Sequence, residues 1–158
     1  MKNRDIAVPV GVFELTSYDA FGKLLERRSV RNKIVDVGLS WMAGALSGDV
    51  ASPATMKYLA IGTGTTAAAA GQTALVTPVE SRTAGTQTRI NTNTGSSYDT
   101  YQCVGTITMT ADRAVTEIGI FSASSSGTLL CRQVFAVMNI PNGGSLAVTY
   151  KVIFTSVS

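Results

Sequence analysis

Two segments of the chain carry residues whose types and spacing suggest chemistry, and the first is the glycine-rich stretch GTGTT from Gly62 to Thr66. Backbone N–H groups of such loops can bind phosphate at the start of a helix. This stretch lacks the lysine of a P-loop and the third glycine of a dinucleotide-binding loop, and it continues into the small residues AAAAG. We therefore interpret it as a surface loop and predict no phosphate or cofactor site there.

The second segment is the apolar run TEIGIF, which contains the single carboxylate of Glu117. If Glu117 points inward it needs a cationic partner, such as Arg82 or Arg132, because an unpaired buried carboxylate is costly. Catalysis by two carboxylates would require a second one nearby, but Asp99 and Asp112 lie at the ends of strand-like segments. We predict a structural ion pair rather than a catalytic acid.

The chain of 158 residues contains no histidine, which is the most common general acid or base and the most common metal ligand. Its acidic residues do not follow the alternating pattern of a calcium-binding loop. Both cysteines, Cys103 and Cys131, lie in strand-like segments, where thiols are usually buried, and we expect no disulfide between them. The composition predicts a protein that is not an enzyme and has no catalytic residue, metal or cofactor.

A dense basic cluster follows the first segment of the chain; it consists of Lys23, Arg27, Arg28, Arg31 and Lys33. Three interpretations are open: a solvated junction between a strand and a helix, a nucleic-acid contact, or a contact with acidic residues of a neighbouring subunit. The net charge of +3 produces little long-range field, so we predict no nucleic-acid partner.

The elements that must position these residues begin with residues 1–31, which we predict to be an extended arm or a hairpin. Asp19 and Gly22 suit the first and last positions of a type I turn. Asn32 can cap a helix over about residues 33–47, which Gly48 ends. Residues 32–158, including this helix, are predicted to form a single domain.

The rest of the chain alternates between strand-like runs and turn residues. Even-numbered residues from Leu146 to Phe154 are apolar, for example, and would face a core. We predict a mainly β fold, an antiparallel β-sandwich or jelly-roll-like body with one helix in the N-terminal half. The predicted runs cover residues 56–62, 86–93, 98–111, 114–123, 127–140 and 145–157.

Membrane association is not expected. No apolar run approaches the length of about eighteen residues that a membrane span requires. The N-terminal sequence MKNRDIAVPVG also lacks the apolar core of a secretory signal. We predict no membrane partner.

The stretch YLAIGTGTTAAAAGQTALVTPVESR, from Tyr58 to Arg82, resembles a segment that recurs in structural proteins of tailed bacteriophages. In that family an IGTGTT strand and an alanine-rich loop lead to TAL and then to an acidic residue and an arginine, here in ESR. The segments NKIVDVGLSWMAGAL, TEIGIF, GTLLCRQVF and PNGGSLAVTYKVIF look like further parts of such proteins. The resemblance implies a structural protein of the virion with a β-sandwich or jelly-roll-like body.

Similar segments occur in tail and tail-fibre components and in small cement, or decoration, proteins of the phage head. We favour a cement protein that bridges capsomers, because the chain shows no coiled coil or collagen-like repeat of a fibre. The expected partners are the major capsid protein or other virion proteins, with self-association and without a small-molecule substrate. The expected location is the virion, assembled in the host cytoplasm.

Two alternatives use the same fold. A tail, baseplate or tail-fibre component would share the sandwich. A carbohydrate-binding module would need exposed aromatic residues on loops, for which Tyr18, Tyr98 and Tyr101 are the candidates.

The predicted interface lies in the first 31 residues. If these residues form an arm that reaches a neighbouring subunit, removing them should leave the sandwich folded and abolish binding. The residues that we expect at this interface are Val10, Val12, Phe13 and Leu15, with Arg27, Arg28 and Arg31 as orienting charges.

Overall fold

The computed structural model describes residues 9–49, 55–92 and 98–154. Within these ranges the chain forms nine strands and one helix. They are β1 (Val10–Tyr18), β2 (Leu24–Ile34), α1 (Asp36–Ser47), β3 (Tyr58–Gly62), β4 (Pro78–Ala84), β5 (Thr86–Ile90), β6 (Thr100–Thr108), β7 (Arg113–Phe121), β8 (Leu129–Ile140) and β9 (Ser145–Ile153).

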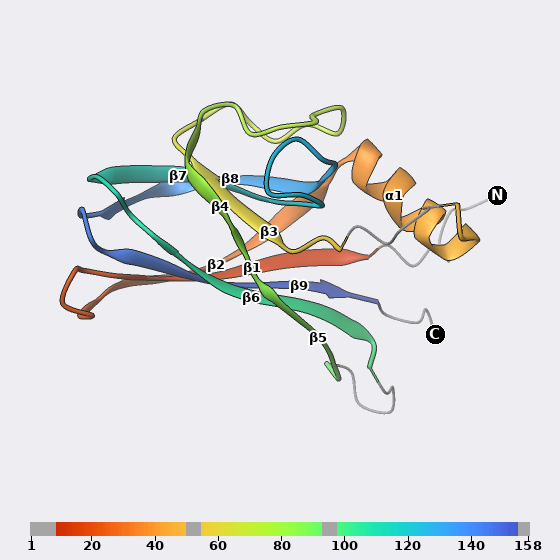
Figure 1. Ribbon diagram of the computed structural model, residues 1–158, viewed down its shortest axis with the longest axis horizontal. Coiled ribbons are helices and arrows are strands. Elements are labelled where there is room, and N and C mark those ends of the chain that lie inside the picture. Colours follow the sequence, from red (N-terminus) through yellow and green to blue (C-terminus); the bar gives the residue numbers. More distant parts are fainter. Residues whose placement is uncertain (1–8, 50–54, 93–97, 155–158) are drawn as a thin grey trace.

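The strands form one antiparallel sheet in the order β4-β3-β7-β8-β2-β1-β9-β6-β5, which is folded into two layers (Figure 1). We call β2, β1, β9, β6 and β5 sheet A, and β4, β3, β7 and β8 sheet B. The two layers are joined where β2 pairs with β8 through Lys33 and Ile34. Elsewhere the chain changes layer through connections between strands, of which the shortest is Gly85 between β4 and β5. The result is a flattened, nearly closed barrel, so the predicted mainly β sandwich with one helix is confirmed.

Gly85 is the residue at which the chain passes from β4 in sheet B to β5 in sheet A. A Cβ atom at this position would lie 2.5 Å from the Sγ atom of Cys103. The N–H group of Gly85 donates a hydrogen bond of 2.8 Å to the carbonyl of Lys57. Only glycine therefore allows the chain to cross here without displacing the core.

Residues 10–34 form the hairpin, one of the two predicted forms, and not an arm that projects from the body. The turn is as predicted: the N–H of Gly22 donates to the carbonyl of Asp19 over 3.1 Å. However, β1 lies inside sheet A, paired with β2 on one side and with β9 on the other. The hairpin is thus part of the barrel wall.

The main core lies between the two sheets and is built from alternate residues of their strands. The even-numbered residues Leu146 to Val152 of β9 are buried, as the alternation predicts. Cys103 and Cys131 are both free, buried thiols. Burial raises the pKa of Cys131 to about 12, so this thiol stays protonated at neutral pH and packs as an apolar group.

A second, smaller core covers the outer face of sheet B. It consists of Val35, Ala60, Leu75, Phe121 and Leu129. Leu75 belongs to the loop of residues 63–77, which folds back over β7 and β8 (Figure 1). Sheet B is therefore covered on both faces, which explains why β7 is buried almost continuously instead of alternately.

Two elements differ from the predictions made from sequence. Helix α1 begins at Asp36 rather than near residue 33, because Asn32 to Ile34 continue β2 and Asn32 does not cap the helix. Its C-terminal end is as predicted, with Gly48 in the left-handed conformation. Strand β4 was not predicted, and it contains a bulge at which Glu80 has a φ of 59°.

Candidate interaction surface

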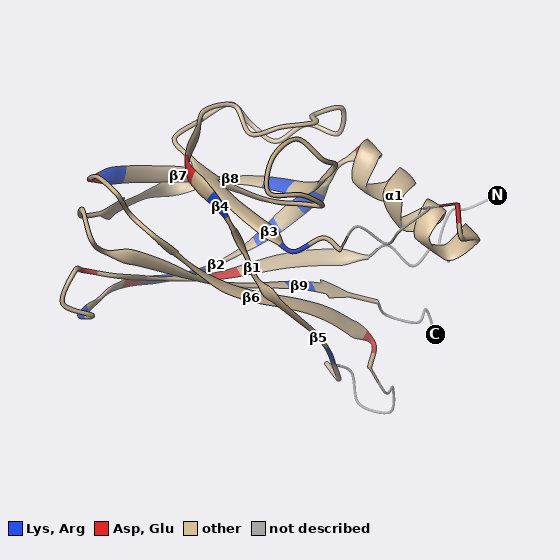
Figure 2. Cartoon of the chain, in the orientation of Figure 1, with Lys and Arg blue, Asp and Glu red and all other residues tan. Residues whose placement is uncertain are grey.

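Exposed cations follow β2 along one face of sheet A. Alternate residues of β2 are exposed, and they include Arg27, Arg31 and Lys33, which we call the basic row. Figure 2 shows where Lys and Arg lie along the chain. In the described part of the chain, no ion pair involves these three residues. The basic row can therefore meet an acidic surface of another molecule.

The neighbouring strand β1 completes this surface. The register places Val12 opposite Arg31, with both side chains on the outer face of the sheet. Val10 has the same orientation and is half-buried, as is Val12. Beside them the carboxylate of Glu14 is already neutralised by the Nζ of Lys151 at 2.8 Å. Of the predicted interface residues, Val10, Val12, Arg27 and Arg31 thus share one outer face.

Two other predicted interface residues face the opposite way. Phe13 and Leu15 are buried in the main core, and the ring of Phe13 lies 4.6 Å from that of Tyr150, measured between centroids. The prediction that they contact a neighbouring subunit is wrong, because the alternation along β1 turns odd-numbered residues inward.

Arg28 is also engaged within the protein. Sheets A and B diverge along β2 and β8, which pair only through Lys33 and Ile34. Arg28 fills this gap: its guanidinium donates to the carbonyl of Ala136 and to the carboxylate of Glu26, and it lies 5.8 Å from the ring centre of Phe135. Arg28 therefore covers the unpaired edge of β8 rather than orienting a partner.

The buried ion pair predicted for Glu117 is present, and its partner is Arg132. The Nε of Arg132 donates to Oε2 of Glu117 over 2.7 Å, and both side chains are 0% exposed. The other candidate, Arg82, binds the carbonyls of Ala123 and Ser126 instead. Glu117 and Arg132 lie on the outer face of sheet B, beneath the loop of residues 63–77.

This ion pair holds the glycine-rich loop. Oε1 of Glu117 accepts hydrogen bonds from the N–H groups of Gly64 and Thr77, at 3.1 and 2.7 Å, and Oε2 accepts one from Val76 at 3.0 Å. Arg132 donates to the carbonyl of Thr66 over 2.9 Å. The loop does use its backbone N–H groups to bind an anion, but the anion is a carboxylate of the same chain.

Glycine is required where the loop meets this carboxylate. A Cβ atom at Gly62 would lie 2.4 Å from Oε1 of Glu117, and one at Gly64 would lie 2.6 Å from it. The two glycines of the GTG segment therefore make room for Glu117.

The pKa of Glu117 reflects two opposing effects. Burial acts to raise it, but the N–H groups of Thr77 and Val76 and the guanidinium of Arg132 bring the pKa below its ordinary value of 4.5. A carboxylate whose pKa is lower in the folded chain stabilises the fold above its unfolded-state pKa, and this contribution is lost as the pH falls through the folded-state pKa.

We therefore expect the free energy of unfolding to decrease once the pH falls below about 4.5, as the carboxylate of Glu117 becomes protonated. Urea unfolding at a series of pH values between neutral and strongly acidic measures this decrease. The same series with Glu117→Gln should show a shallower dependence on pH. An equal dependence in both proteins would contradict the assignment.

Among the described residues, no group of three or more cysteine, aspartate or glutamate side chains is placed to hold a metal ion. The helix in the described ranges is too short to cross a membrane. Tyr98 is exposed, but Tyr101 donates its hydroxyl inward to the carbonyl of Met56, so the aromatic residues proposed for carbohydrate binding do not gather on one surface.

Comparisons of the chain with known protein families, with curated proteins and with solved structures find no match.

Proposed function

We propose that this protein is a structural component of a tailed-bacteriophage particle, and specifically a cement protein that bridges capsomers on the phage head. The basic row of β2 would contact an acidic surface on the major capsid protein or on another virion protein. The observation that carries this proposal is a sheet face with three exposed cations that form no ion pair in the described part of the chain.

The resemblance of residues 58–82 to phage structural proteins supports the choice of class. Its most distinctive segments, IGTGTT and TAL, lie at the end of β3 and in the loop of residues 63–77, which Glu117 and Arg132 hold against sheet B. These residues stabilise the fold, so this part of the resemblance supports a shared fold and does not identify the residues that contact a partner. The contact with the particle then depends on the surface residues.

The geometry of the surface suits a contact between repeated subunits. The basic row lies on a regular strand, β2, which pairs with β1 along most of its length, so binding requires little ordering of the backbone. Charges of one sign on such a face mainly orient the partner and accelerate association. Many copies on a repeating lattice would provide overall affinity, even if each contact is weak.

The experiment is to mix the purified protein with undecorated, expanded phage heads and to measure how much protein sediments with them. We expect saturable binding that weakens as the salt concentration rises, because exposed charges are screened. The variant Arg27→Gln with Arg31→Gln should bind about tenfold more weakly or worse, which corresponds to about 1.4 kcal/mol or more.

The matched control is Lys57→Gln with Arg89→Gln, which removes the same charge from residues outside the basic row. It should bind like the unmodified protein. Failure of the unmodified protein to bind heads would overturn the cement proposal, and binding to isolated tails or baseplates would favour the alternative of a tail component. Equal loss of binding in both double variants would show that net charge matters and the basic row does not.

A further inference from the structure

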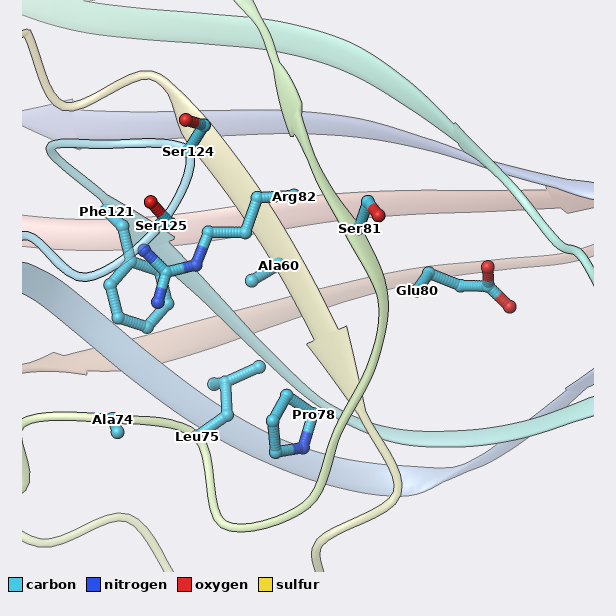
Figure 3. A pocket seen from close by; sticks show the side chains of 10 residues that line it. All are labelled: Ala60, Ala74, Leu75, Pro78, Glu80, Ser81, Arg82, Phe121, Ser124 and Ser125. Atoms are coloured by element: carbon cyan, nitrogen blue, oxygen red, sulfur yellow. The ribbon is translucent and has the colours of Figure 1, made fainter.

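A pocket opens on the outer side of sheet B, between β4 and the turn that joins β7 to β8 (Figure 3). Its volume is about 480 Å³. Ala60, Leu75, Pro78 and Phe121 form the apolar part of its wall, while Arg82 and Ser125 are among its polar residues. This pocket lies on the other sheet from the basic row.

The guanidinium of Arg82 has a fixed position in this pocket. It lies over the ring of Phe121, with its carbon 3.5 Å from the ring centre (Figure 3). Its Nη1 donates to the carbonyl of Ala123 over 2.9 Å and to that of Ser126 over 2.5 Å. Stacking and two hydrogen bonds thus hold the planar group in one orientation.

This arrangement leaves one edge of the guanidinium without a partner. In the described part of the chain, no hydrogen bond or ion pair involves Nε or Nη2 of Arg82. These N–H groups are also not enclosed by the protein, since they are absent from the buried polar atoms that lack a partner. The Nε and Nη2 edge of arginine matches the two oxygens of a carboxylate.

Glu80, the acidic residue among those that line the pocket, does not use this edge. Glu80 follows Pro78 and Val79 in β4, and the bulge turns its side chain away from Arg82 (Figure 3). The carboxylate of Glu80 accepts from Nε of Arg113 at 2.6 Å and from the hydroxyl of Thr110 at 2.8 Å. The bulge thus separates a neutralised carboxylate from a guanidinium whose charge is not neutralised.

The walls around Arg82 are also fixed. Leu75 precedes Val76 and Thr77, whose N–H groups are held by Glu117. On the other side, the N–H of Ser122 donates to the carbonyl of Thr128 over 3.0 Å and closes the turn that carries Ser125. A ligand would therefore enter a pocket that is already formed.

We propose that this pocket binds a carboxylate carried on an apolar group. The carboxylate would accept two hydrogen bonds from Nε and Nη2 of Arg82, and the apolar group would pack against Leu75 and Pro78. A carboxylate fits better than a phosphate, because Arg82 supplies one positive charge and much of the remaining wall is apolar. The group can come from a free organic acid or from the C-terminal residue of a peptide.

The test is a titration of the purified protein followed by the NMR chemical shifts of backbone amides. Isovalerate serves as the free acid, and acetyl-alanyl-leucine with a free carboxylate serves as the peptide; isovaleramide and the amidated peptide are the neutral counterparts. We expect saturable shifts at Leu75, Arg82 and Ser125 with the acids and not with the amides. Tighter binding of the peptide than of isovalerate assigns a peptide end as the source, and equal binding assigns the free acid.

Variants of Arg82 provide a second, independent test of the proposal. Arg82→Gln should weaken binding of isovalerate by about tenfold or more, because it removes a charged hydrogen-bonding partner. The matched control Arg89→Gln, on β5 at the opposite end of the strand order, should bind like the unmodified protein. Equal binding of acids and amides by the unmodified protein, an absence of saturable shifts, or full affinity in Arg82→Gln would each overturn the proposal. The comparison of acids with amides needs no variant, and its outcome is independent of binding to phage heads.

Discussion

Replacing Glu117 with glutamine is expected to lower the free energy of unfolding by about 3 to 5 kcal/mol. The substitution leaves the guanidinium of Arg132 in a fully buried position without a counter-charge. The N–H groups of Val76 and Thr77 would also lose a charged acceptor. Urea unfolding at neutral pH, followed by circular dichroism, measures the difference.

The matched control is Glu14→Gln, which breaks the exposed pair between Glu14 and Lys151. Solvent already screens that pair, so the loss should be about 1 kcal/mol or less. Hydrogen exchange adds a local measurement: the amides of Gly64, Val76 and Thr77 should exchange faster in Glu117→Gln, because their acceptor is weakened. Similar losses for the two variants would contradict a special role for the buried pair.

Removal of residues 1–31 is expected to abolish cooperative folding, in contrast to what an independent arm would allow. The deletion removes β1 from between β2 and β9, together with most of β2. It also removes Phe13 and Leu15 from the main core and leaves β9 with one unpaired edge. The truncated chain should show no cooperative unfolding transition by circular dichroism and should aggregate.

The control for this deletion is Phe21→Ala at the tip of the hairpin, where the side chain is 96% exposed. This variant should unfold like the unmodified protein, because a single exposed side chain contributes little to stability. A truncated chain that keeps a cooperative transition of similar midpoint would restore the view that these residues form a separate arm.

The alternation of apolar and polar residues was enough to predict most of the strands. It works best for β9, where one face packs on the core and the other meets solvent. It also places the odd-numbered residues of β1 on one face, but it cannot tell whether that face meets the core or a partner. The position of β1 in the sheet is decided by pairing with β9, which is far away in the sequence.

Local irregularities account for the elements that the sequence did not reveal. Strand β4 begins at a proline and places Glu80, Ser81 and Arg82 opposite the single residue Ala60 of β3, so its side chains do not alternate regularly. The start of α1 was misplaced because Asn32, a good capping residue, is also compatible with the end of a strand.

The sequence predicted that Glu117 forms an ion pair, but it did not decide between Arg82 and Arg132 as the partner. A buried Glu117 requires a cationic partner, and the pairing of β7 with β8 selects Arg132. Arg132 lies opposite Gly119, which is two residues after Glu117, so the two side chains are diagonal neighbours on the same face. Arg82 could be excluded only once the bulge of β4 was known. The same bulge forms the pocket, so no linear pattern in the sequence indicates it.

The pairing of β1 with β9 has a further consequence, for folding kinetics. Val10 lies opposite Ile153, so the first described strand acquires one of its two neighbours only after nearly the whole described chain is available. Contacts between such distant segments raise the contact order, and folding of all-β proteins with high contact order takes milliseconds to seconds rather than microseconds. β1 and β2 precede β9 in the chain, so β1 can pair with β2 before its second neighbour exists. Sheet A can therefore be completed only once β9 has been synthesised.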